Sequence, residues 1–139
     1  MNKQAALLSV LLLAGSGLVQ AAPRGHLAMD HSSASLMDKP TAAALWQQHL
    51  TARVVKLYPV GKWGFISQVE GGFDENKACV LTARAMMVPR SGKNLLFVPT
   101  KSATTFATQP GATAEQCRAL AKTKLDEAII AVRSSLLKD

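Results

Sequence analysis

The strongest pattern of hydrophobic and polar positions lies near the C-terminal end of the chain, where apolar residues recur every three or four positions. This spacing places them on one face of a helix, so the pattern predicts an amphipathic C-terminal helix. Thr113, followed three residues later by Gln116, predicts a capping box at its start. The apolar stripe consists of Cys117, Leu120, Ala121, Leu125, Ala128, Ile129, Val132 and Leu136.

A second pattern, strict alternation between two sets of residues, predicts a strand from Ala78 to Val88. One set is small and apolar, whereas the other contains Thr82 and Arg84. We therefore expect the first set to face the core of the protein. This buried set consists of Cys79, Leu81, Ala83, Ala85 and Met87.

Shorter patterns predict the remaining elements. Apolar residues at helical spacing predict a short helix over residues 40–51. The Gly-rich segment 70–77 has the composition of an exposed turn. Together these elements predict an α+β fold, with a short N-terminal helix, an antiparallel sheet of about four strands and the C-terminal helix packed on the sheet. Runs of aromatic and β-branched residues predict the other strands over 53–58, 63–69, 95–99 and 102–108.

The two cysteines of the chain, Cys79 and Cys117, fall on the predicted buried faces of the strand and of the C-terminal helix. This agreement predicts one structural disulfide that joins the helix to the sheet. The alternative, a redox or metal-binding pair, usually has C-x-x-C spacing, which these residues lack. Closing the loop between them would stabilise the fold by roughly 4 kcal/mol in the chain-entropy description.

The N-terminal residues have the order of an export signal, with Lys3, an apolar run, small residues and then Val19-Gln20-Ala21. This order predicts a signal peptide over residues 1–21 that is cleaved after Ala21. We therefore expect the protein in the periplasm or fully secreted, where disulfides form, and not spanning a membrane. Residues 22–39 lack apolar periodicity and predict a flexible tail, and 40–139 predict one small domain.

Charge and motifs limit the function. The chain carries 16 Lys and Arg against 9 Asp and Glu, a formal net charge of +7, which suits an anionic surface as a partner. Export argues against nucleic acid, and the sequence contains no G-x-S-x-G, H-E-x-x-H or phosphate-loop motif. We therefore expect a non-catalytic binding or interaction protein of the envelope, such as an inhibitor or an accessory factor, whose partner is an envelope protein or an anionic surface.

The predicted surface for such a partner surrounds the 70–77 turn and combines aromatic with basic side chains. The other interpretation is that its aromatics are ordinary core residues at strand ends. The candidate surface residues are Lys62, Trp63, Phe73 and Lys77.

A second hypothesis concerns His26, Met29 and His31, because imidazole and thioether groups are ligands that suit copper. The Met29-Asp30-His31 step resembles the Met/His repeats of periplasmic copper-resistance proteins. That resemblance implies copper or another soft metal as a cofactor held by these three residues in the tail. The alternative is a tail that binds no metal.

Overall fold

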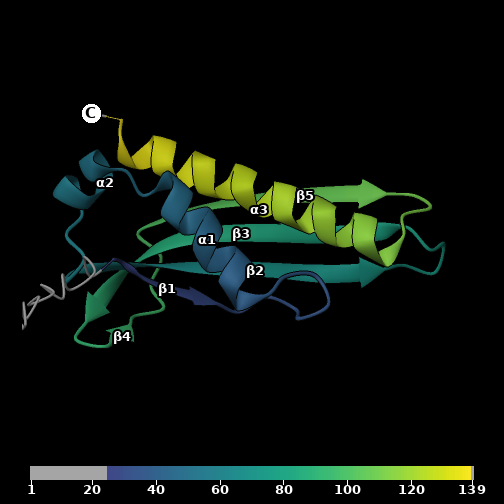
Figure 1. Ribbon diagram of the computed structural model, residues 1–139, viewed down its shortest axis with the longest axis horizontal. Coiled ribbons are helices and arrows are strands. Elements are labelled where there is room, and N and C mark those ends of the chain that lie inside the picture. The colour runs from purple at the N-terminus through teal and green to yellow at the C-terminus, as the bar shows by residue number, and fades with distance from the viewer. Residues whose placement is uncertain (1–24, 139) are drawn as a thin grey trace, which may run out of the picture.

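Three long strands and one long helix make up about half of residues 25–138, the part of the chain that the computed structural model describes. The strands form an antiparallel sheet, and the helix then runs back across it (Figure 1). The predicted signal peptide and its cleavage site lie outside the described residues. The four elements are β2 (Trp63–Phe73), β3 (Cys79–Ser91), β5 (Lys101–Gln109) and α3 (Ala114–Leu136).

A short strand, β1 (Leu27–Asp30), extends the sheet alongside β2. Because β1 runs parallel to β2, with Leu27 opposite Gly64, the sheet is mixed and the prediction of an antiparallel sheet was wrong at this edge. The strand order is β1-β2-β3-β5. A two-residue strand, β4 (Asn94–Leu95), pairs separately with the end of β3.

The position of β1 also corrects the prediction of a flexible tail over residues 22–39, as far as that segment is described. Backbone hydrogen bonds continue past the strand, from His31 N to Ser67 O at 2.9 Å and from Ser33 N to Val69 O at 2.9 Å. Four strand residues are too few to show a hydrophobic period in the sequence. This segment is held in place by its pairing with β2, which lies far away in the sequence.

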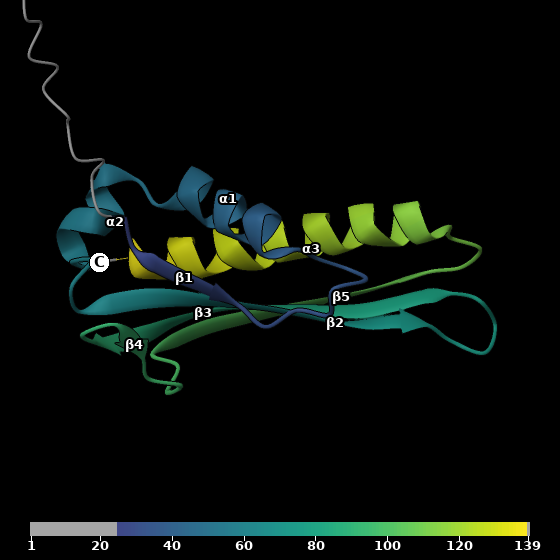
Figure 2. The same ribbon diagram turned by 60° about the horizontal axis from the view of Figure 1, so that its bottom comes forward.

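Helices α1 (Lys39–His49) and α3 lie on the same side of the sheet, and the main core fills the space beneath them (Figure 2). Trp46 of α1 and Phe65 of β2 meet in this core with ring centroids 4.5 Å apart. The indole Nε1 of Trp46 donates to the hydroxyl of Ser67 at 2.8 Å. None of the helices within residues 25–138 combines the length and the apolar character needed to cross a membrane.

The predicted disulfide is confirmed. Cys79 and Cys117 are bonded, with Cα atoms 5.7 Å apart and both side chains buried. The capping box at the start of α3 is also present, because the Thr113 hydroxyl accepts from Gln116 N and the Gln116 side chain accepts from Thr113 N. The disulfide therefore joins the first turn of α3 to the first residue of β3.

Three local predictions were wrong. The strand predicted over 95–99 is reduced to β4, which ends at Leu95. Residues 53–58 were expected to form a strand, but the chain forms the short helix α2 (Ala52–Leu57), whose one buried residue is Val54. The packing of that single side chain overrides the strand propensity of its neighbours. The predicted turn over 70–77 is shorter, since β2 continues through Phe73. Glycine at position 71 lets the backbones of β2 and β3 approach closely, because a Cβ there would lie 2.1 Å from the carbonyl oxygen of Val80.

Candidate functional site

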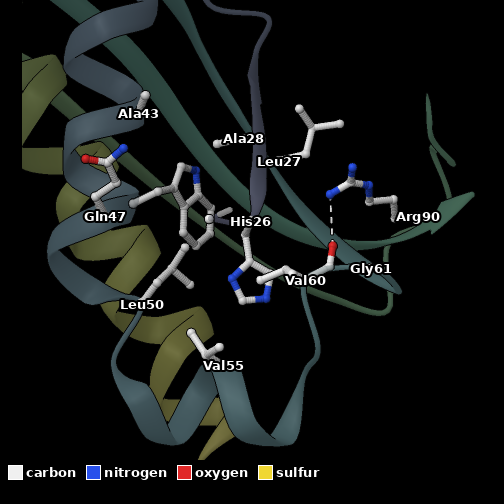
Figure 3. A pocket seen from close by; sticks show the side chains of 12 residues that line it. His26, Leu27, Ala28, Ala43, Gln47, Leu50, Val55, Val60, Gly61 and Arg90 are labelled. Atoms are coloured by element: carbon white, nitrogen blue, oxygen red, sulfur yellow. Dashed lines mark hydrogen bonds between the residues drawn. The ribbon is translucent and has the colours of Figure 1, made fainter. Parts of the chain in front are cut away.

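A groove of about 780 Å³ opens between β1, α1 and the chain that connects α2 to β2. Its walls are largely aliphatic, and Figure 3 shows Ala43 from α1 and Val55 from α2 among them. Trp46 of α1 also lines the groove. The polar side chains in the lining are His26, Gln47 and Arg90. The complete lining is Gly25, His26, Leu27, Ala28, Ala43, Trp46, Gln47, Leu50, Val55, Val60, Gly61 and Arg90.

The helical period of α1 explains one wall. Trp46 and Gln47 lie three and four positions after Ala43, and Leu50 lies four and three positions after them, so the four residues follow one side of the helix. Trp46 is almost fully buried, and its bond to Ser67 fixes the indole against the sheet. The side of α1 that lines the groove is therefore fixed by its packing in the protein core.

The guanidinium of Arg90 lies at the edge of the groove and is held by two backbone carbonyls. Nη1 donates to Val60 O at 2.9 Å (Figure 3), and Nε donates to Gly92 O at 2.7 Å. No carboxylate within the described chain forms an ion pair with it. Because carbonyls carry no net charge and a guanidinium has five N–H donors, Arg90 keeps its full charge and spare donors for an anion.

His26 supplies a second polar group on the other side of the groove. Its Nε2 lies 2.6 Å from the carbonyl oxygen of Tyr58, and its ring meets Phe65 edge-on with centroids 5.1 Å apart. Since a carbonyl oxygen only accepts, Nε2 is the donor in this hydrogen bond. The histidine therefore joins the start of β1 to the end of α2 and leaves one ring nitrogen for a ligand.

The groove can bind, but its lining offers little for covalent chemistry. It contains no carboxylate, hydroxyl or thiol side chain among the residues that the structure describes. An apolar wall beside a guanidinium suits a ligand with an aliphatic body and an anionic group.

The structure does not bring the predicted copper ligands together. All three belong to the extended segment around β1, where alternate residues face opposite sides of the sheet. His26 points to the helix side, against Phe65, whereas His31 meets Phe97 on the other side, with ring centroids 5.5 Å apart. Met29 shares the side of His31 and is 40% exposed.

The predicted partner surface is likewise divided. Lys62 and Trp63 lie at the start of β2, and Phe73 and Lys77 lie at its far end. Ten residues of extended strand separate Trp63 from Phe73 by roughly 33 Å. The four side chains therefore do not form one surface around a turn, and Lys62 and Trp63 lie near the end of the molecule that holds the groove.

Sequence reasoning missed the groove and Arg90. The sequence shows Arg90 as one cation in a Pro- and Gly-containing segment, and its position depends on carbonyls from two separate segments. The helical spacing of Ala43, Trp46 and Leu50 was visible, but it indicated a core face rather than the wall of a groove.

Comparison of the chain with protein-family models and with curated proteins gave no match.

Proposed function

We propose that this protein is a non-catalytic binding protein of the cell envelope that holds a small amphipathic anion in the groove between α1 and β1. The observation that carries the proposal is the guanidinium of Arg90, which has no carboxylate partner in the described chain and borders an apolar groove. Guanidinium groups bind carboxylate and phosphate oxygens through paired hydrogen bonds. The anionic group of the ligand would lie at Arg90 and its aliphatic part along α1.

The size and chemistry of the groove support a small molecule as the ligand. Its volume of about 780 Å³ lies within the range of small-molecule sites, and such sites combine apolar walls with a few polar groups. The lining lacks a paired nucleophile and base, which supports binding without turnover. Export of the protein remains part of the proposal, and the disulfide is compatible with an oxidising compartment.

The test uses calorimetric titration with decanoate, decanol and decyltrimethylammonium, which share an alkyl chain and differ in the head group. We expect decanoate to bind most tightly, and Arg90→Gln to weaken decanoate binding by about tenfold because a charge-assisted hydrogen bond is lost. Arg84→Gln is the matched control, since it removes the same charge from the sheet outside the groove. Equal binding of all three probes would contradict an anion site.

A second variant tests whether the groove itself is the site. Gly61 lines the groove, and a Cβ added there meets no atom within 4 Å, so a larger side chain can enter the open space without displacing the fold. We expect Gly61→Trp to abolish decanoate binding while the thermal unfolding midpoint stays unchanged. If Gly61→Trp binds decanoate as the native protein does, the ligand lies elsewhere.

A further inference from the structure

Four apolar side chains are exposed near each other on the side of the sheet opposite α1 and α3. Met29 belongs to β1, and the other three follow β4 in the chain. Phe97 meets His31, two positions beyond Met29, which places the loop beside β1. We call these residues the apolar patch: Met29 (40% exposed), Leu96 (47%), Phe97 (57%) and Val98 (67%).

The loop that carries the patch is fixed at both ends. Leu95 packs on a small second core formed by Ile66, Met86 and Val88. Leu96 N donates to Pro89 O at 2.9 Å, and Thr100 N donates to Met87 O at 2.9 Å. Because the backbone is tied to β3 on either side, residues 96–98 are held away from the core rather than folded into it. Figure 2 shows β4 and the following loop projecting from the sheet on the side away from the helices.

The segment around the patch carries positive charge without acidic residues. Residues 76–114 contain no Asp or Glu, and Lys93 and Lys101 stand on either side of the loop with exposed side chains. Asp30 follows Met29 on β1, and its carboxylate accepts a hydrogen bond from the Ser32 hydroxyl at 2.6 Å. The basic residues of the segment are Lys77, Arg84, Arg90, Lys93 and Lys101.

We infer that the apolar patch docks this protein on the surface of an anionic lipid bilayer, with Leu96, Phe97 and Val98 inserted at the headgroup level and Lys93 and Lys101 on lipid phosphates. A protruding apolar tip beside cations matches the boundary between acyl chains and anionic headgroups. A cluster of exposed apolar side chains on a protein surface usually marks a site of contact with a partner or a membrane. This inference goes beyond the proposed function and does not depend on a ligand in the groove.

The test measures how much protein sediments with lipid vesicles. It uses the protein as it is isolated from the cell that produces it, with no change to its N-terminus. Vesicles of phosphatidylcholine alone are compared with equal parts of phosphatidylglycerol and phosphatidylcholine. We expect the mixed vesicles to bind more protein, and added salt to reduce the difference. Phe97→Ser should lower the partition coefficient on mixed vesicles by about tenfold, because the side chain no longer leaves water. Lys93→Gln with Lys101→Gln should remove most of the preference for the mixed vesicles.

Phe73→Ser is the matched control, since Phe73 is 49% exposed and lies at the far end of β2 from the patch. It should bind mixed vesicles as the native protein does. Equal loss in Phe73→Ser and Phe97→Ser, or no loss in Phe97→Ser, would overturn the inference. Failure of the native protein to bind vesicles, together with a dimer in solution that Phe97→Ser abolishes, would assign the patch to self-association instead. Unchanged thermal unfolding in all variants excludes misfolding as the cause.

Discussion

The hydroxyl of Ser67 is the one polar side chain that the structure places fully inside the core of residues 25–138. It accepts the indole proton of Trp46, whose ring packs on Phe65 and also lines the groove. A polar group buried in this way costs free energy unless its hydrogen bond is made. One hydrogen bond therefore fixes both a core residue and a wall of the candidate site.

We predict that Ser67→Ala destabilises the protein by about 1–3 kcal/mol, because the indole N–H of Trp46 is left buried without an acceptor. Unfolding in urea, followed by Trp fluorescence, measures this change. Ser91→Ala is the control: Ser91 is exposed at the end of β3, and the expected change is within about 0.5 kcal/mol. A Ser67→Ala value as small as that of the control would mean that the bond makes no net contribution.

The residues of the site differ in how far the sequence could predict them. Cys79 and Cys117 were predicted as a pair because each lies on a periodic pattern of its own, and the two patterns are long. Arg90 and His26 have no such pattern. Their contacts are backbone carbonyls 30 and 32 positions away, so their roles depend on the tertiary arrangement of β1, α2 and β3.

At the scale of an element, the start of α1 has a charged cap. The Asp38 carboxylate accepts from Thr41 N at 2.8 Å, and this hydrogen bond holds the pKa of Asp38 below its ordinary value of 3.8. Because the pKa is lower in the folded state, the ionised cap stabilises the fold at pH values above the ordinary pKa of 3.8. The stabilisation is lost as the pH falls through the lower, folded pKa.

We predict that Asp38→Asn makes stability less dependent on pH below about pH 4, because an amide oxygen caps the helix without titrating. The measurement is the thermal unfolding midpoint along an acid series. The control is Glu75→Gln, which removes an exposed carboxylate from the turn between β2 and β3. The neighbouring Asp74 is unsuitable as a control because its carboxylate accepts hydrogen bonds from backbone amides of that turn. Parallel acid profiles for the native protein and Asp38→Asn would refute a role for the cap.

The long elements were more predictable than the short ones. The 23 residues of α3 and the 13 residues of β3 repeat their periods several times, so their buried faces could be read from the sequence. The 4 residues of β1 and the 6 residues of α2 contain no more than two periods each, and long-range packing decides their state. Because β1 was not predicted, its parallel pairing at the edge of the sheet was not predicted either.

Over the whole molecule, the groove and the apolar patch lie at the same end, where β2 begins and β3 finishes. Arg90 connects them, because its side chain borders the groove while its backbone pairs with Leu95, next to the patch. A molecule docked through the patch would hold this end of the sheet, with the side chain of Arg90, close to the bilayer surface, while α1 and the wall it forms lie on the other side of the sheet. Amphipathic anions concentrate at that surface, so the two proposed sites would draw on the same environment.

The disulfide has a further consequence for this protein in a compartment that contains proteases. Cys79 and Cys117 close residues 79–117 into a covalent ring, and the loop with Lys93 and Lys101 is part of that ring. A single cut by trypsin after either exposed lysine therefore opens the ring without separating the pieces. We expect the nicked protein to run as one band on a non-reducing gel and as two after reduction. Two bands without reductant would mean that the ring had not closed, whereas one band would show that the disulfide holds the two pieces together.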